Sequence, residues 1–311
     1  MLSRDEPWRS LRLAVVAGAL AAAPFEMLAM DVTALWNFAD PTASEAAFRA
    51  ALVTARDRDD VLILQTQIAR SLGLRSRFAE AHALLDEIEP QLAEAGPEPR
   101  VRHRLERGRA FRSAGLLERA RPLFEEAAAS AASAHLDGLH IDALHMVALV
   151  LPTPAEQLGA NERALDAALA STDPAARRWQ ASLANNIGMS LHELGRDEDA
   201  LASFQRALAA RQQLGQARET RIARWMIDWT LRLLERHEEA LADLHRLETE
   251  LAQIGETDAF VFEEIAENLE SLRRRDEAGP YFAKAHRLLA ADTSPARVDT
   301  GRLDRLQRMS R

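Results

Sequence analysis

The sequence of 311 residues predicts an all-α fold, a solenoid of antiparallel helix pairs with about six repeats after an N-terminal half-repeat. Apolar residues recur at helical spacings of three and four, and no strand pattern stands out. A small apolar residue also recurs at intervals of 39, 40, 40, 40 and 38 residues, at Ala81, Ala120, Ala160, Ala200, Ala240 and Ala278. A fixed period of this size is typical of stacked helical repeats.

The stretch from Ala181 to Arg211 shows one repeat most clearly, as two helices joined by a tight turn. Gly188 has no side chain and lets the two helices approach closely, and Phe204 supplies the bulk beside it. Gly195 is predicted to end the first helix, because glycine readily adopts the left-handed conformation found at helix C-termini. Asp197 is predicted to cap the second helix.

Residues 1–39 are predicted to be an extension before the repeats, either a lead-in helix or a weak export signal. The apolar segment Leu11–Ala23 is shorter than the roughly 20 residues that span a bilayer. It resembles the core of a signal peptide, although Asp5 and Glu6 stand where a basic leader is usual. We therefore expect a cytoplasmic protein, with export as the alternative if this segment is a signal core. Met30 is an alternative start of the chain.

Residues 40–293 are predicted to form the helical repeats. Asp40-Pro41 marks the start of the half-repeat, because proline is favoured in the first turn of a helix. Later breaks between helices are predicted at Gly96-Pro97, Thr153-Pro154, Asp173-Pro174, Gly255 and Ser294-Pro295. Residues 294–311 are basic and are predicted to be a tail or a capping helix.

The composition excludes several classes of function. Cysteine is absent, which excludes disulfides, thiol nucleophiles and thiolate metal sites. The net charge of −9 argues against nucleic-acid binding through a basic surface. Lys284 is the only lysine, so 39 minus 1 leaves 38 arginines. This bias, together with abundant alanine, suggests a GC-rich bacterial genome.

No catalytic motif is found. Neither a glycine-rich phosphate loop nor a G-x-S-x-G elbow occurs. His192-Glu193 begins like a zinc-protease motif, but Arg196 takes the place of the second histidine. Three histidines are spaced by five residues, which does not bring them together on a helix: His135, His140 and His145. We expect a protein that is not an enzyme and that uses no cofactor, metal or membrane.

The repeat pattern resembles the tetratricopeptide repeat over about residues 58–291. Asn185-Asn186-Ile187-Gly188, followed by Leu194-Gly195-Arg196, is similar to the long-period repeats of kinesin light chains. HEAT repeats have a comparable period, but the small-residue pairs and short turns favour the tetratricopeptide family. Arg107 and Asp228 depart from the pattern, since they replace an apolar and a small residue. The resemblance implies a right-handed superhelix in which the first helix of each pair lines a concave groove.

The resemblance also implies which side chains line this groove, from fixed positions of the first helices. They are Arg70, Arg102, Arg109, Arg112, His145, Asn185, Met189, His192, Trp225 and Trp229. Three of the arginines on one helix share a face by their spacing alone: Arg102, Arg109 and Arg112. A basic stripe in an acidic protein would attract an acidic segment or a free carboxylate.

These residues predict a scaffold that binds a peptide or protein segment in the groove. Asn185 would offer an amide to a peptide backbone, and the tryptophans would be apolar anchors. Two plainer interpretations stay open: the arginines pair with Glu106, Glu118 and other acids on a solvated face, and Trp225 and Trp229 belong to the core. The alternative function is a peptide-responsive regulatory or sensor protein that acts through a conformational change. Homo-oligomers are also compatible with the sequence.

Overall fold

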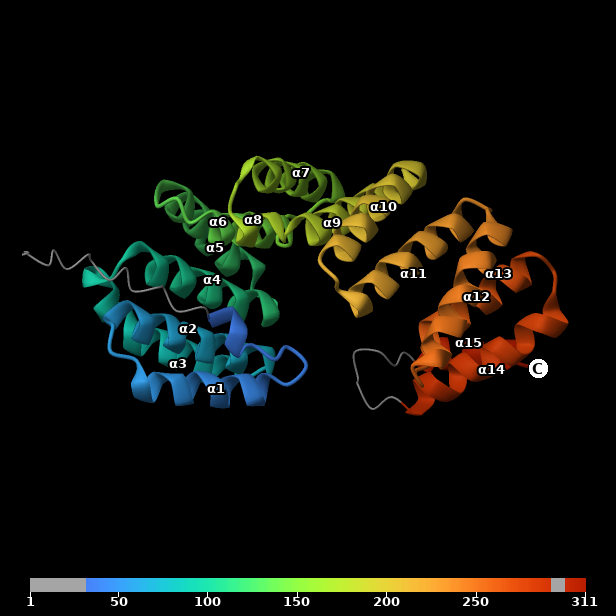
Figure 1. Cartoon of the computed structure of the whole chain (residues 1–311), viewed down its shortest axis with the longest axis horizontal. Helices are drawn as coiled ribbons and strands as arrows, with labels where there is room; N and C mark the ends of the chain where they lie inside the picture. The colour runs from blue at the N-terminus through green and yellow to red at the C-terminus, as the bar shows by residue number, and fades with distance from the viewer. Residues whose placement is uncertain (1–31, 292–299) are drawn as a thin grey trace, which may run out of the picture. The chain divides into compact units, whose positions relative to one another are not determined.

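The structure is a computed structural model that describes residues 32–291 and 300–311. Within these residues every regular element is a helix (Figure 1). The predicted all-α solenoid of helix pairs is therefore confirmed. The signal-like segment Leu11–Ala23, the alternative start at Met30 and the break at Ser294-Pro295 lie outside the described residues. None of the described helices is both long and apolar enough to cross a membrane.

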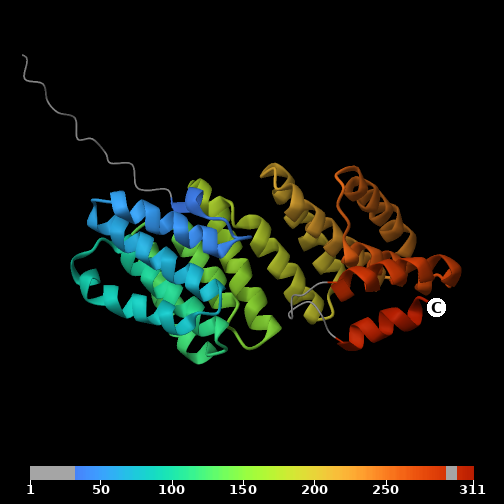
Figure 2. The ribbon, with the colours of Figure 1, turned by 90° about the horizontal axis from the view of Figure 1, so that it is seen from below.

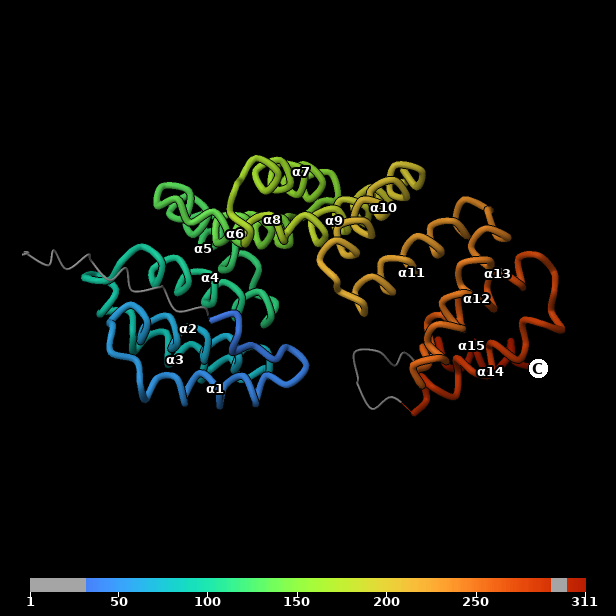
Figure 3. The backbone as a smooth tube through the Cα atoms, viewed as in Figure 1, coloured from blue at the N-terminus to red at the C-terminus, as the bar shows by residue number. Residues whose placement is uncertain are grey.

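The helices follow one another along the chain with short connections. The described elements are η1 (Val32–Leu35), α1 (Pro41–Thr54), α2 (Arg58–Leu74), α3 (Phe78–Ile88), η2 (Glu89–Glu94), α4 (Pro97–Ser113), α5 (Leu117–Ser133), α6 (Asp137–Ala148), α7 (Pro154–Ala170), α8 (Pro174–Arg177), α9 (Gln180–Glu193), α10 (Asp197–Gln213), α11 (Ala217–Leu233), α12 (His237–Gln253), α13 (Ala259–Ser271), α14 (Arg275–Ala291) and α15 (Thr300–Met309). Helices with similar colours, which are neighbours in the sequence, lie side by side (Figure 2). The backbone tube reverses direction between α11 and α12 (Figure 3).

Left-handed residues end many of these helices. Gly195 has a φ of +72°, and the N–H of Arg196 then donates to the carbonyl oxygen of Leu191 at 2.9 Å, which confirms the predicted stop. The same conformation recurs, mostly about 20 residues apart, at Ser76, Gly115, His135, Gly215, Glu235, Gly255 and Arg273. Since 20 residues are half a repeat, the turn is repeated after first and second helices alike.

Side-chain caps confirm two of the predicted helix starts. Asp40 Oδ1 accepts hydrogen bonds from the backbone N–H groups of Thr42 and Ala43, both at 3.0 Å. Thr153 Oγ1 accepts from the backbone N–H of Glu156 at 3.3 Å. In each case the capping oxygen satisfies an N–H group that has no partner within the helix.

The fourth pair departs from the prediction at both helix starts. Asp173-Pro174 begins only the single turn of α8, and α9 starts later, at Gln180. The predicted cap at Asp197 is wrong: Asp197 is the first residue of α10, and Arg196 occupies the N-cap position without a side-chain cap. The carboxylate of Asp197 lies 2.6 Å from Nδ1 of His192 instead. The imidazole of His192 on the preceding helix therefore takes the side chain away from the backbone.

The two helices of a pair meet where a small residue faces a large one. A Cβ atom placed on Gly188 would lie 2.5 Å from Cε1 of Phe204, and one on Gly108 would lie 2.5 Å from Cε1 of Phe124. Both phenylalanine side chains are fully buried. The close approach anticipated from Gly188 and Phe204 is confirmed, and in these two pairs it allows the helices to pack closely.

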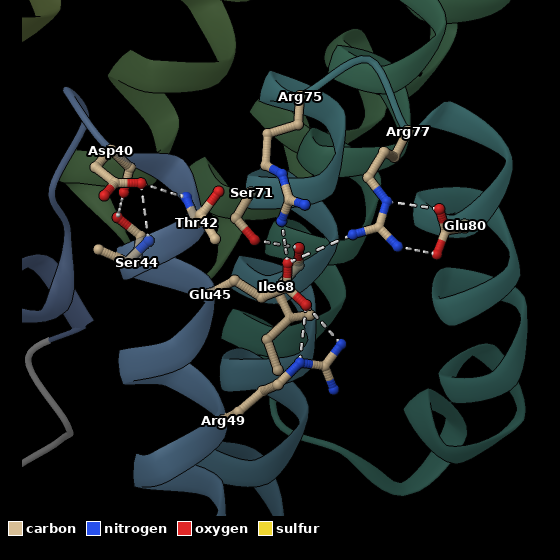
Figure 4. A network of polar contacts seen from close by, with 11 residues as sticks. Asp40, Thr42, Ser44, Glu45, Arg49, Ile68, Ser71, Arg75, Arg77 and Glu80 are labelled. Carbon is tan, nitrogen blue, oxygen red and sulfur yellow. Dashed lines mark hydrogen bonds and ion pairs between the residues drawn. The ribbon is translucent and has the colours of Figure 1, made fainter.

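Single helices, α1 and α15, cover the first and the last helix pair. On α1, Phe48 is fully buried, and Glu45 accepts hydrogen bonds from Arg75 at 2.5 Å and from Arg49 at 2.8 Å (Figure 4). After the last pair, α15 buries Leu306 completely within the apolar cluster of the fifth and sixth pairs. A stack of repeats needs such covers because its terminal faces would otherwise be exposed to water.

Candidate binding face

The first helices of the pairs are α2, α4, α6, α9, α11 and α13, and we call the side that they share the first-helix face. Side-chain contacts join each of these helices to the next: Arg70–Glu106, Arg109–Asp142, His145–Asn186, His192–Trp229 and Arg232–Glu264. All ten residues predicted to line a groove lie on these helices. They do not form one continuous site, because they line separate pockets along the face or pack between helices.

Arg109 is the centre of a buried charge network. It donates to Glu106 Oε1 at 2.6 Å and also to Asp142, and Nη1 of Arg70 lies 3.8 Å from Glu106. Burial lowers the pKa of Arg109, but Asp142 and Glu106 outweigh burial and raise it overall. The pKa of Arg70 is lowered, first by burial and then by the charge of Arg109. Both guanidinium groups are therefore occupied within the protein.

The predicted basic stripe is largely neutralised. Arg102 pairs with Glu98 at 2.7 Å, one turn earlier on α4. Arg112 forms no ion pair with any described residue and lines a pocket of about 180 Å³ together with Arg70 and Arg109. Glu106, one of the acids named in the alternative, contacts Arg70 and Arg109, but it is buried and does not lie on a solvated face.

An aromatic pocket of about 480 Å³ lies at the N-terminal end of the face. The Trp36 Nε1–H donates to Oε1 of Gln67 at 3.0 Å, and Phe38 stacks on Trp36 with a centroid separation of 4.7 Å. Arg70 lies over both rings, and Trp179 closes the other side. Sequence reasoning missed these rings, because Trp36 and Phe38 precede the first repeat.

A smaller pocket of about 310 Å³ lies between α6, α9, α10 and α11, and we call it the amide pocket. His145, Ser182, Asn185, Asn186 and Arg211 contribute polar groups to it. Asn186 Nδ2 lies 3.2 Å from Nδ1 of His145, whose pKa burial lowers to about 4. The imidazole is therefore neutral at pH 7, and the amide donates to it. The side chain of Asn185 forms no hydrogen bond with any described residue.

Arg211 was not among the predicted site residues, because it lies on the second helix of its pair. It donates to Oε1 of Gln216 at 2.6 Å and to Oγ of Ser182 at 2.9 Å. Burial lowers its pKa. Among the described residues no carboxylate forms an ion pair with it, although Glu219 lines the same pocket. No spacing signal could have indicated it, since only the packing of α10 against α9 and α11 brings it to this face.

The two tryptophans of α11 are half-buried. Trp225 donates from Nε1 to the carbonyl oxygen of Phe260 at 3.1 Å and borders a pocket of about 580 Å³. Both tryptophans line another pocket, of about 290 Å³, which three arginine–glutamate pairs surround. Each ring thus packs between helices and also borders a pocket.

Met189 and His192 line none of these pockets. Met189 packs against the apolar cluster that contains Phe204. His192 is held by Asp197, and its ring meets that of Trp229 edge to face at a centroid distance of 4.4 Å. In this structure the two residues contribute to the packing of α9 against its neighbours.

Several solved structures have a similar fold. The apo form of RapI is 12% identical, with a TM-score of 0.67 over 89% of this chain and 82% of that chain. Kinesin-light-chain repeats of Podosopora anserina, described as TPR-like, are 15% identical, with a TM-score of 0.52 over 65% and 99%. NprR in complex with its cognate peptide NprX is 14% identical, with a TM-score of 0.52 over 90% and 80%. These similarities show that this chain shares the fold of the three proteins.

A family profile identifies the repeat itself. Residues 181–214 match the profile described as tetratricopeptide repeat, in the stretch where the sequence shows the pattern most clearly. A search of curated protein sequences finds no match. The matched segment covers α9 and α10, with the glycine–phenylalanine contact between them. Residues 181–214 thus match the tetratricopeptide repeat, and the fold is similar to that of kinesin-light-chain TPR-like repeats, in agreement with the resemblance seen in the sequence.

Proposed function

We propose that this protein is a bacterial cytoplasmic scaffold that binds an extended segment of a partner protein along the first-helix face, without making or breaking bonds. The observation that carries this proposal is the unpaired side-chain amide of Asn185. Its amide borders the amide pocket and has no hydrogen-bond partner among the described residues. A carboxamide offers two donors and an acceptor, which matches the alternating N–H and C=O groups of a peptide backbone.

The arrangement of the pockets supports an extended partner. The aromatic pocket, the amide pocket and the tryptophan pockets follow one another along neighbouring helices. Apolar rings beside a few polar groups are the usual composition of recognition sites. The complex of NprR with the peptide NprX also supports a peptide as the class of partner, since the two chains share the fold over most of their lengths.

Because most arginines of the stripe already have ion-pair partners, charge can contribute little to binding a partner protein. Arg70, Arg102 and Arg109 are each within ion-pair distance of an acid of the same face. Displacing Glu106 or Asp142 from the arginines would leave these carboxylates buried and unpaired, which costs free energy. We therefore propose that amide and aromatic contacts carry most of the binding, and that Arg112 is the arginine of the stripe that remains available to an acidic partner.

A peptide-display experiment tests the proposal. Peptides selected from a random library on the purified protein would be measured in solution by fluorescence anisotropy. We expect Asn185→Ala to weaken their binding roughly threefold to tenfold, the effect of one or two lost hydrogen bonds. Gln205→Ala is the matched control, because it removes the same amide from an exposed position on α10. Failure to select any peptide, or equal effects of the two variants, would contradict the proposal.

A further inference from the structure

A pocket of about 580 Å³ lies between the fifth and the sixth helix pair, and we call it the inter-pair pocket. Apolar side chains from all four helices form its walls, among them Ile222 and Trp225 of α11, Leu247 and Leu251 of α12, Val261 of α13 and Leu289 of α14. The three leucines are buried, so the pocket reaches past the first helices into the layer of second helices. A volume of this size is usual for sites that hold small molecules.

The inter-pair pocket is the counterpart of the amide pocket one repeat later in the chain. At the 40-residue step of the repeats, Asn185 of the amide pocket corresponds to Trp225, and Arg211 corresponds to Leu251. Apolar side chains thus replace the amide and the guanidinium group of the preceding repeat. The two pockets share a place in the repeat, but the chemistry of the second suits an apolar ligand.

The polar groups beside these apolar walls already have partners. The Trp225 Nε1–H donates to the carbonyl oxygen of Phe260 at 3.1 Å. The carboxylate of Asp258 accepts a hydrogen bond from the backbone N–H of Phe260 at 2.8 Å and caps α13. An apolar body inside the pocket would therefore displace no hydrogen bond of the protein, and it would gain the free energy of leaving water.

The exposed part of the lining carries two arginines of α11. Arg221 donates to Glu256 at 2.9 Å, in a pair whose acid is more than half exposed. An exposed pair of this kind contributes little to stability, so it can rearrange at small cost. Arg218 is exposed and forms no ion pair with any residue that the structure describes. Arg218 can therefore act as the counter-ion of an anionic ligand at the entrance of an otherwise apolar pocket.

An elongated apolar body with one anionic end matches this distribution of groups. We propose that the inter-pair pocket binds a fatty-acid anion, with its alkyl chain against the leucines and its carboxylate beside Arg218 and Arg221. A peptide backbone suits the interior less well, because its N–H and C=O groups would find no free partners there. This ligand goes beyond the proposed function, since it is a small molecule and its site does not include Asn185.

A series of amphiphiles tests the ligand class. Isothermal titration calorimetry of the full-length protein with octanoate, decanoate and dodecanoate, each below its micelle-forming concentration, measures the affinities. We expect each added methylene to tighten binding about threefold to fourfold, because it adds buried apolar surface. Dodecyltrimethylammonium carries the same chain with the opposite charge and should bind about fivefold or more weakly than dodecanoate. The net charge of −9 favours the cation in general, so a preference for the anion reports the local arginines.

Two pairs of variants place the ligand in this pocket. Ile222→Glu puts a carboxylate on the pocket wall and should weaken dodecanoate binding tenfold or more, by about the loss of the apolar contact and the repulsion of like charges. Ile254→Glu is the matched control, because it adds the same charge at an exposed isoleucine that does not line the pocket. Arg218→Gln should weaken dodecanoate binding about twofold to fivefold, whereas Arg206→Gln, at an exposed position of α10, should leave it unchanged. Circular dichroism checks that each variant is folded.

Affinity that rises with chain length, favours the anion and is lost in Ile222→Glu but kept in Ile254→Glu supports the fatty-acid site. The absence of binding by all three acids overturns it, and so do equal losses in the two glutamate variants. A preference for the cation, or an Arg218→Gln variant that binds dodecanoate as the parent protein does, overturns the placement of the carboxylate. None of these results bears on the proposed function, which the peptide measurements with Asn185→Ala test separately.

Discussion

Gly188 on α9 lies so close to Phe204 on α10 that a single added carbon would meet the ring at 2.5 Å. We expect Gly188→Ala to destabilise the protein by about 1–3 kcal/mol, because overpacking forces the ring or the helix to move. Gly73→Ala is the control: nothing lies within 4 Å of that position, so the better helix propensity of alanine should leave stability unchanged or raise it. Urea unfolding followed by circular dichroism measures both. Similar losses for the two variants would contradict the role of the close contact.

The network around Arg109 should be a large contributor to stability. Arg109→Ala leaves Glu106 and Asp142 buried without their cation, and we expect a loss of about 3–5 kcal/mol. Arg112→Ala, three residues later on the same face, removes no ion pair among the described residues and should change stability by less than about 0.5 kcal/mol. The same unfolding measurement separates the two. Equal effects would mean that the network adds little beyond the bulk of an arginine side chain.

Asp228 replaces the small residue of the fifth repeat, and its buried carboxyl group reduces the stability of the folded protein. Its side chain is almost fully buried, and neither carboxylate oxygen has a hydrogen-bond partner. Burial, followed by the charge of Asp243, raises its pKa to about 9, although Arg224 opposes this and Glu264 adds to it. Between pH 4 and pH 9 the folded state thus holds a proton that the unfolded state has released. Stability therefore falls as the pH rises, by up to about 1.4 kcal/mol per unit.

The variant Asp228→Asn removes this proton linkage and keeps the shape. We expect it to be more stable than the parent protein, by a margin that grows from pH 5 to pH 9. Asp166→Asn, at an exposed position, should follow the parent protein across the same range. Unfolding midpoints at pH 5, 7 and 9 test this, and a margin that does not change with pH would refute the buried-acid account.

For His145 the effect of pH on stability has the opposite sign, because stability is lost as the pH falls. Burial lowers its pKa to about 4, with a partial opposing effect from Asp142. As the pH falls below about 6.5 the unfolded state takes up a proton and the folded state does not, so stability is lost between pH 6.5 and pH 4. His145→Gln should lose less stability than the parent protein over this interval. In a proton NMR titration the ring signal of His145 should stay constant from pH 8 to pH 5. A midpoint near pH 6.5 would contradict its burial.

Much of the fold could be predicted from the sequence, because the signals that determine it are local and repeated. Gly195 ends its helix as expected, since only neighbouring backbone atoms are involved. The contact between Gly188 and Phe204 could be predicted because the two residues are 16 positions apart on two helices joined by a short turn. The cap predicted at Asp197 failed because a competing partner, His192, is close only after folding.

The sequence could predict which helices carry the candidate site, but not which of its side chains are paired and which are free. The repeat period alone places Arg109 and Asn185 on first helices, because every pair repeats the same geometry. Whether a charge is free or paired depends on distances between helices that are 30 or more residues apart, as for Arg109 and Asp142. Only the tertiary structure therefore decided that Arg109 is neutralised, that the amide of Asn185 remains open and that Arg211, from a second helix, reaches the same pocket. The repeat determines where side chains stand, and the packing of successive pairs determines which of them have partners.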